Sequence, residues 1–456
     1  MSKFALLFLL VFFGGVVAAL AYSGTAAFVV YQVVYFFNPD NRWWANSIPG
    51  LRYSLIASLL MLSVLAAKYR HYSEMSPWGE MAPFKWMLAV LGMYFVAYIF
   101  ALDLPNHKRF TFEFLKLIII VLVAYKLIYS EKALKVCLWV YIMGCAYIGY
   151  LAHVTGRNAQ GRVEGIGMVD SLDANDTAAA LVPSAVLLLY FAWMGDKKIR
   201  VLSVVCGALI ANGLVLINSR GAFLACVVSL GIFILFMIFS SQQRKGQRFT
   251  AVLMVVVGLS GAIYVTDDLF WERMGTLKEI EDKETSGSSR MVFWWTTFDM
   301  LEDHPMGMGI NGYNRLAPQY MDDDTRGGVE FRSVHSTWFQ GLSELGWLGF
   351  GFFCCMLLSL YRLSRKAKKY VMSLDNAQAY FQILALECAF IGYLAAGTFI
   401  NRFRAEILYW MILFLAVAIK VYYLQAKKAN ADASGEGDAA TYKRAKFTRK
   451  SRDVYT

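Results

Sequence analysis

Apolar runs long enough to cross a bilayer recur along the whole chain, with short polar segments between them. Runs of about 20 mostly apolar residues predict spans near residues 51–67, 84–102, 112–129, 133–153, 175–194, 199–217, 221–239, 249–264, 337–361, 379–399 and 404–424. The first apolar stretch, Phe4 to Phe37, precedes further spans and has no small-residue cleavage site, so we expect a retained membrane segment. The pattern therefore predicts an all-α polytopic membrane protein with about 12 transmembrane helices, or 13 if the first stretch crosses twice.

Basic residues gather in the short loops on one side of this alternation. They are Lys197, Lys198, Arg200, Arg244, Lys245, Arg248, Arg362, Arg365, Lys366, Lys368 and Lys369. Because lysine and arginine favour cytoplasmic loops, we expect this side to face the cytoplasm, together with the basic tail after Leu424. The net charge of +11 then reflects topology and contact with anionic lipids. No basic segment adjoins a soluble domain, so we expect no nucleic-acid partner.

The composition, 58% hydrophobic and 16% aromatic, fits no soluble class. Seven cysteines all fall inside predicted spans, where they pack as small apolar side chains and predict no disulfide framework: Cys137, Cys145, Cys206, Cys226, Cys354, Cys355 and Cys388. The polar and basic tail cannot bury a core, so we expect disorder there. The chain thus divides into an N-terminal transmembrane bundle (1–264), a large loop (265–334), C-terminal transmembrane helices (335–425) and a basic cytoplasmic tail (426–456).

The loop between residues 265 and 334 is long for a connection between spans, and such loops usually carry function. Helical apolar spacing from Leu269 to Ile280 and from Met291 to Leu301 predicts two short interfacial helices, the second capped by Ser288 or Ser289. The glycines between Met306 and Gly312 predict tight turns, followed by a polar stretch from Asp322 to Gly328.

The external side of this topology favours arginine over lysine. It holds Arg42, Arg52, Arg109, Arg157, Arg162, Arg220, Arg273, Arg290, Arg315, Arg326, Arg332, Arg402 and Arg404, against Lys108, Lys278 and Lys283. Arginine binds phosphate through two parallel hydrogen bonds and keeps its proton, so the bias suggests diphosphate recognition. Any single arginine more often pairs with a carboxylate or reaches lipid headgroups. Arg220 differs because it sits in a connection too short to be an ordinary solvated loop.

His335 stands where the long loop enters an apolar helix. A partly desolvated histidine there suits a general base acting on a sugar hydroxyl. A histidine bonded to the backbone at the helix start is an equally open interpretation. Glu344 lies nine positions further on, about 180° around the helix, so we do not expect it to pair with His335.

The remaining histidines predict no metal site. His71 falls in a cytoplasmic loop, His107 and His304 in polar loops beside proline, and His153 near a helix end, none at a zinc-ligand spacing. Glu387 lies in the middle of a span, where a carboxylate is either functional or the partner of a buried polar group.

Several short motifs follow one another between residues 175 and 350. In order, they are Ser219-Arg220-Gly221-Ala222, Ser289-Arg290 with Trp294 and Trp295, His304-Pro305-Met306-Gly307-Met308-Gly309, His335-Ser336 and Glu344-Leu345-Gly346-Trp347-Leu348-Gly349. Each is weak alone, but their order around one large loop resembles the O-antigen ligase and polymerase superfamily. Asn38-Pro39 with Trp43, and Trp271-Glu272-Arg273-Met274, are further similar to the O-glycosylation ligase branch found with exosortase systems.

The resemblance implies a metal-independent, inverting glycosyltransferase that needs no cofactor. Such an enzyme moves a glycan from undecaprenyl diphosphate to an acceptor hydroxyl at the periplasmic face of the bacterial inner membrane. By family similarity Arg220 and Arg290 bind and neutralise the diphosphate, and His335 deprotonates or orients the hydroxyl. The Asp322-Asp323-Asp324 segment has no family counterpart, which leaves the acceptor open.

Three functions remain open. The chain is a ligase acting on lipid A core, or a polymerase or protein O-glycosylation ligase with the same donor, or a transporter or flippase. Transporters usually show inverted repeats and midplane charges, whereas the charges here gather at the external face. Protein-directed relatives often carry an added external C-terminal domain, so the short basic tail favours a lipid acceptor.

Overall fold

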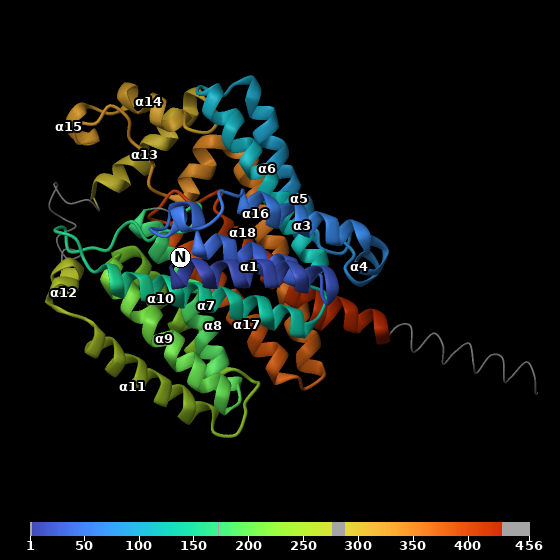
Figure 1. Ribbon diagram of the computed structural model, residues 1–456. Coiled ribbons are helices and arrows are strands. Elements are labelled where there is room, and N and C mark those ends of the chain that lie inside the picture. The colour runs from blue at the N-terminus through green and yellow to red at the C-terminus, as the bar shows by residue number, and fades with distance from the viewer. Residues whose placement is uncertain (1, 172, 276–287, 431–456) are drawn as a thin grey trace, which may run out of the picture.

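The computed structural model describes residues 2–171, 173–275 and 288–430. Within these ranges the chain is helical, with no strand and a single isolated bridge between Met168 and Ser171 (Figure 1). The bundle consists of α1 (Lys3–Ala21), α2 (Thr25–Phe37), α3 (Tyr53–Ala67), α4 (Tyr69–Met75), α5 (Ala82–Val96), α6 (Leu104–Leu127), α7 (Glu131–Thr155), α8 (Ala174–Met194), α9 (Lys197–Ile217), α10 (Arg220–Phe239), α11 (Gln247–Val265), α16 (Thr337–Ser373), α17 (Ala377–Gly397) and α18 (Glu406–Ile419).

Ten of the described helices are long and apolar enough to cross a membrane, and an eleventh crossing arises if the bent pair of α3 and α4 forms one span. The polytopic all-α class is therefore confirmed, whereas the count of 12 is not. The first apolar stretch breaks at residues 22–24, and α2 has 13 residues, fewer than the 20 or so that a span needs. The length of α6 suffices, but Lys108, Arg109 and Glu113 make its first half polar.

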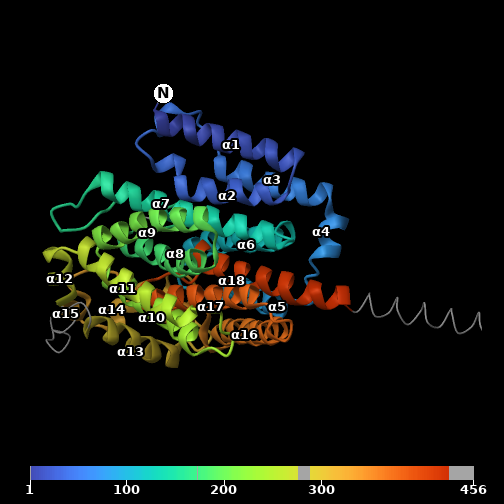
Figure 2. The ribbon, with the colours of Figure 1, turned by 90° about the horizontal axis from the view of Figure 1, so that it is seen from below.

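The most deeply buried helices are α8, α17 and α18. Every residue of α18 from Ile407 to Ile419 is buried, as expected for a helix that neighbours surround on all sides. Figure 2 shows α1, α2 and α3 along one side of the bundle and α16 along the other. On the periphery, α11 buries only Gln247 and Ala251 and leaves its apolar surface facing outward, as lipid-facing helices do.

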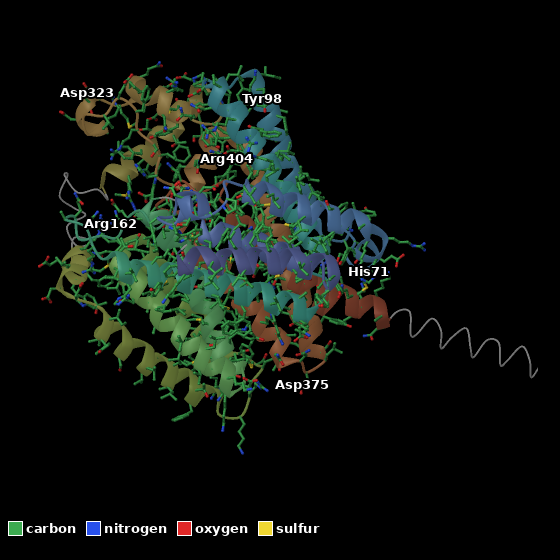
Figure 3. All side chains as sticks on the ribbon, viewed as in Figure 1. His71, Tyr98, Arg162, Asp323, Asp375 and Arg404 are labelled. Atoms are coloured by element: carbon green, nitrogen blue, oxygen red, sulfur yellow. The ribbon has the colours of Figure 1, made fainter. Side chains whose placement is uncertain are left out.

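Labelled side chains in Figure 3 separate toward two ends of the bundle. Arg162, Asp323 and Arg404 lie toward one end, and His71 and Asp375 toward the other. This separation agrees with the alternation derived from the basic loops. Which end faces the outside of the cell stays a prediction.

The long loop is folded over one end of the bundle. It holds α12 (Asp268–Gly275), α13 (Ser288–Asp303), α14 (Gly312–Tyr320) and α15 (Asp323–Arg326). Its core consists of Phe293, Met300, Leu301, Met308, Tyr313, Leu316, Ala317, Met321 and Val334, packed with Leu342 of α16. The two helices predicted in this loop are confirmed as α12 and α13, although residues 276–280 of the first expectation lie outside the described part. Their place at the membrane interface stays a prediction. The tail from residue 431 onward, for which we expected disorder, also lies outside the described part.

Two features of this loop were not predicted. α14 forms directly after the glycine turns, and its interior Pro318 hid it from the sequence pattern. The polar stretch after it is also helical, because the Asp322 carboxylate caps α15 by accepting from the Thr325 N–H at 2.8 Å. Asp323 forms an ion pair with Arg326 in the same short helix. Asp322 and Asp323 therefore stabilise local structure.

Candidate functional site

The connection between α9 and α10 is only two residues long. Asn218 ends α9 in the left-handed conformation, with φ at 55°, which asparagine tolerates better than most residues. Ser219 is extended, and Arg220 is already the first residue of α10. The hairpin therefore holds Arg220 at the positive end of a helix, where the first N–H groups have no partner within the helix.

Arg290 lies in the first turn of α13, which rests on the beginning of α16. The Trp294 ring stacks on Phe339 at 5.5 Å between centroids, and Phe298 packs edge-on against the same ring. Burial, and then the positive charges of Arg220 and Arg332, lower the pKa of Arg290. The fold therefore brings together the two arginines singled out from the sequence, with Arg332 as a third.

Five arginines from distant segments form one group, the arginine cluster: Arg162, Arg220, Arg273, Arg290 and Arg332. Burial and then the charges of Arg162 and Arg220 lower the pKa of Arg273. The guanidinium of Arg162 is anchored to the Ile217 carbonyl and to Asn175 Oδ1. The positive charges repel one another, and a bound anion would offset that repulsion.

The Cζ atom of Arg332 lies over the Phe293 ring, 5.0 Å from its centroid. Its buried Nε has no hydrogen-bond partner among the described residues. Burying a polar group without a partner costs free energy, so such a group suits contact with a ligand. The sequence placed Arg332 among the external arginines, but no signal in the pattern distinguished it from the others.

His335 follows directly on this segment in a strained conformation. Its φ of 50° belongs to the left-handed region, which residues other than glycine rarely adopt. The segment is held to the α17–α18 connection, because the Ser336 N–H donates to Asn401 Oδ1 at 3.0 Å and the Thr337 hydroxyl to the Ile400 carbonyl at 2.8 Å. The imidazole Nε2 lies 3.2 Å from Ser333 Oγ.

The environment of His335 keeps its imidazole neutral at neutral pH. Burial, and then the positive charges of Arg290 and Arg332, lower its pKa to about 4. The Asp173 carboxylate opposes this shift weakly. Asp173 caps α8 through the Asn175 N–H at 2.7 Å, and its charge also acts on Arg290. Sequence analysis missed Asp173, although an aspartate just before a predicted span is a capping signal.

Most of the other arginines that the sequence assigns to the external side have conventional partners. Arg109, Arg157, Arg315, Arg326, Arg402 and Arg404 form ion pairs with Glu113, Asp267, Asp103, Asp323, Asp170 and Glu344 respectively, and Arg402 also pairs with Asp176. Arg42 donates to the carbonyls of Phe36 and Phe37. In the described ranges neither Arg290 nor Arg332 forms an ion pair. Pairing with a carboxylate or a carbonyl therefore accounts for most of these arginines, but not for Arg290 and Arg332.

Two of the sequence motifs interlock through their backbones. The helix α16 breaks at Gly346, where φ is 61°, and the Ser343 and Glu344 carbonyls accept from the Met308 and Gly309 N–H groups at 2.8 and 3.0 Å. A Cβ on Gly346 would lie 2.3 Å from the Pro305 carbonyl oxygen, so only glycine fits. These motifs fix the loop against α16 and thereby position the residues before and after them.

The two glutamates considered from the sequence are structural partners. Glu344 accepts from the Tyr94 hydroxyl at 2.7 Å and pairs with Arg404, and it does not contact His335, as predicted. Glu387 accepts from Ser364 Oγ at 2.6 Å and pairs with Lys368. Of the two interpretations left open for Glu387, the structure supports a partner for buried polar groups.

The placement of His107 in a polar loop was wrong. It lies buried in the first turn of α6, accepts from the Ile310 N–H at Nδ1 and lies 2.7 Å from the Tyr94 carbonyl at Nε2. His71 lies in α4 and not in a loop. All seven cysteines are free thiols inside membrane helices. Over the described residues, no group of three or more His, Cys, Asp or Glu side chains could hold a metal ion.

Comparison with known families covers the same part of the chain. Residues 205–354 match the family model described as O-antigen ligase. The match runs from α9 to the first part of α16 and includes Arg220, Arg290 and His335. No curated protein matches the chain significantly. The resemblance to the O-antigen ligase and polymerase superfamily seen in the motifs is thereby confirmed over residues 205–354.

Proposed function

We propose that this protein is a glycosyltransferase that transfers a glycan from undecaprenyl diphosphate to an acceptor hydroxyl at the periplasmic face of the bacterial inner membrane. The observation that carries the proposal is the convergence of Arg220, Arg290 and Arg332 beside a neutral His335. The family match implies ligase-type or polymerase-type chemistry, and the cluster supplies a reason for this donor.

The arginine cluster suits a diphosphate leaving group. Diphosphate departs readily when its charge is neutralised, and guanidinium groups do this with bidentate hydrogen bonds. Arg290 and Arg332 form no ion pair with any described carboxylate, so their donors are available to the ligand. The start of α10 adds further N–H donors beside Arg220. These charges fill the role that a divalent cation plays in other phosphate chemistry, and we propose that no metal takes part.

His335 suits the role of general base toward the acceptor. Its pKa of about 4 makes it neutral but weakly basic at neutral pH. A bound diphosphate would offset the charges of Arg290 and Arg332, which are causes of that shift, and so raise the pKa toward the range where a base works best at neutral pH. Donor binding would therefore activate the base.

The reaction that follows is a single displacement. The acceptor oxygen forms a bond to the anomeric carbon, the bond from that carbon to the diphosphate oxygen breaks, and its electron pair leaves with the diphosphate. The hydroxyl proton passes to His335. One displacement inverts the anomeric configuration. Lipid A core is the acceptor that we favour, and a growing glycan or a protein hydroxyl would use the same steps.

The test is transfer by the purified full-length protein with undecaprenyl diphosphate glycan as donor. Arg290→Ala and Arg220→Ala should each lower kcat/KM by about 100-fold or more, since each removes a charged contact to the leaving group. Arg290→Lys should recover little activity, because an ammonium group cannot form the bidentate contact.

The matched control is Arg52→Ala, an exposed arginine before α3, for which we expect wild-type rates. Near wild-type transfer by the Arg290→Ala protein, with normal membrane insertion, would overturn the proposal.

A further inference from the structure

A cavity of about 230 Å³ lies beside His335, on the side of the loop formed by α6, α14 and the start of α16. Its wall is rich in side chains that both donate and accept hydrogen bonds: Asn106, Asn314, Ser333, Gln340, Ser343 and Asn401. The rings of Phe110 and Tyr313 also line it. Amides together with aromatic rings can bind hydroxyl groups and the apolar face of a sugar ring.

The charged groups of this wall are compensated. Glu344 and Arg404 both line the cavity and form an ion pair with each other. Beneath the wall, hydrogen bonds from Asn106 and Asn311 and the guanidinium of Arg315 lower the pKa of Asp103 to about 2. The cavity is therefore close to neutral, in contrast to the arginine cluster, and it offers no net positive charge to a phosphate.

The bonds that hold the wall leave ligand-binding groups available. Asn106 donates its amide nitrogen to Asp103 at 2.9 Å, and Asn314 donates to Asn311 at 2.7 Å. Within the described part of the chain, the amide oxygens of Asn106 and Asn314 and the amide nitrogen of Asn401 have no partner. The side chains are thus held in place while their other ends remain open to a ligand, as preorganised binding requires.

The cavity adjoins His335 through two of its own residues. Ser333 lines it and has its Oγ 3.2 Å from His335 Nε2. Asn401 lines it and accepts from the N–H of Ser336, the residue after the histidine. Arg332, just before Ser333, belongs to the cluster. The short segment 332–336 therefore separates a cationic site from a neutral one.

We propose that this cavity binds the terminal sugar of the acceptor and presents its hydroxyl to His335. This inference rests on the proposed function and names where its second substrate binds. A displacement with inversion requires the hydroxyl to approach opposite the leaving diphosphate, so the acceptor needs a site other than the arginine cluster. The volume lies below the roughly 300 Å³ at which pockets for drug-sized ligands begin, which suits one uncharged monosaccharide unit.

The first test compares the kinetics of Asn314→Leu with wild type, using undecaprenyl diphosphate glycan as donor and lipopolysaccharide that lacks O-antigen as acceptor. Leucine keeps the size of the side chain and removes its hydrogen bonds. We expect the acceptor KM to rise about tenfold while the donor KM stays within twofold. The matched control is Asn46→Leu, an exposed asparagine in η2 (Ala45–Ser47), which should change neither constant.

Other results would overturn the inference. A rise in the donor KM with an unchanged acceptor KM would make the cavity a site for the donor sugar. Unchanged values of both constants would show that the amide wall does not bind substrate.

A second test does not depend on transfer. Binding of lactose, a neutral disaccharide, is measured by saturation-transfer NMR on the full-length protein in lipid nanodiscs. We expect a signal for wild type that Asn314→Trp removes by filling the cavity and that inorganic diphosphate leaves unchanged.

The two tests separate the two proposals. If wild type transfers no glycan but shows this lactose pattern, the proposed donor fails and the sugar cavity stands. Equal lactose signals for wild type and Asn314→Trp, or displacement of lactose by diphosphate, would overturn the cavity whatever the transferase result.

Discussion

The arginine cluster and the amide-lined cavity lie on either side of His335, and they differ in whether their charges are paired. In the cavity wall Arg404 is balanced by Glu344, and beneath the wall Arg315 is balanced by Asp103. In the cluster the charges of Arg220 and Arg332 instead act on Arg290, and neither Arg290 nor Arg332 has an ion-pair partner among the described residues. Desolvating an unpaired charge costs on the order of several kcal/mol, so repelling cations signal an anionic ligand more clearly than paired ones do.

The comparison also separates stability from function among residues of one type. Arg402 is held by Asp170 and Asp176 at 3.1 and 3.4 Å and fixes the α17–α18 connection to the start of α8. Removing one partner of such a buried pair strands the other and destabilises the fold. Removing Arg290 or Arg332 relieves repulsion without breaking an ion pair, so it should leave stability unchanged or raise it. Loss of activity without loss of stability is thus what we expect of these two arginines.

The largest effect that the comparison predicts is at His335, between the arginine cluster and the cavity. His335→Ala should lower kcat by about 10²- to 10⁴-fold, the range typical of a lost general base, while donor affinity changes little. Single-turnover kinetics and donor binding measured on the same preparation would separate the two effects. If donor binding falls as much as turnover, the histidine is a phosphate ligand that acts together with the arginine cluster.

Arg332→Ala should have an intermediate effect and test how the arginine cluster acts on His335. Donor affinity should fall about tenfold, because one charged hydrogen-bonding partner is lost. Removing this positive charge should also raise the pKa of His335 from its value near 4. The neutral form of the base predominates above its pKa, so the acidic limb of the kcat/KM profile should move to higher pH.

An NMR titration of the His335 imidazole in the Arg332→Ala protein would check the sign of that shift. Arg52→Ala is again the control, with an unshifted acidic limb. An acidic limb that stays in place in Arg332→Ala would show that Arg332 does not act on the histidine.

The smallest expected effect is that of chelation. If arginine and not a divalent cation meets the charge of the leaving diphosphate, transfer by the purified protein should stay within twofold of its rate in excess EDTA. Activity that EDTA abolishes and magnesium restores would contradict the arginine mechanism, and the two sides of His335 would then no longer divide the substrates by charge.

Part of the site could be read from the sequence because its signals are local. The two-residue connection at Arg220, with apolar helices on both sides, needs only chain order to be recognised, and so does the entry of His335 into a helix. Arg332 and Asp173 could not be found this way. Both act on Arg290, which lies in a distant segment of the chain, and chain order does not reveal that relation.

The prediction of helices from the sequence met the same limit. Apolar length predicted the membrane helices, but the helix count stayed open where α2 is short and α6 polar. The glycines before α14 predicted tight turns. The helix itself was not predicted, because it contains a proline, which in a sequence pattern indicates the end of a helix. The sequence suggested a loop at His107 because charged residues stand beside it. In the fold these residues lie on the outer face of α6, and the imidazole points inward.

The sequence by itself determined the all-α membrane class, the alternation of basic loops, the long loop and the resemblance to the superfamily, since bilayer length, charge bias and motif order are all properties of neighbouring residues. Only the tertiary structure decided which external arginines are paired and which converge, because a guanidinium is neutralised by whatever carboxylate the packing brings within reach. It also decided that an uncharged, amide-lined cavity adjoins the histidine, since its wall is assembled from α6, α14, α16 and the α17–α18 connection.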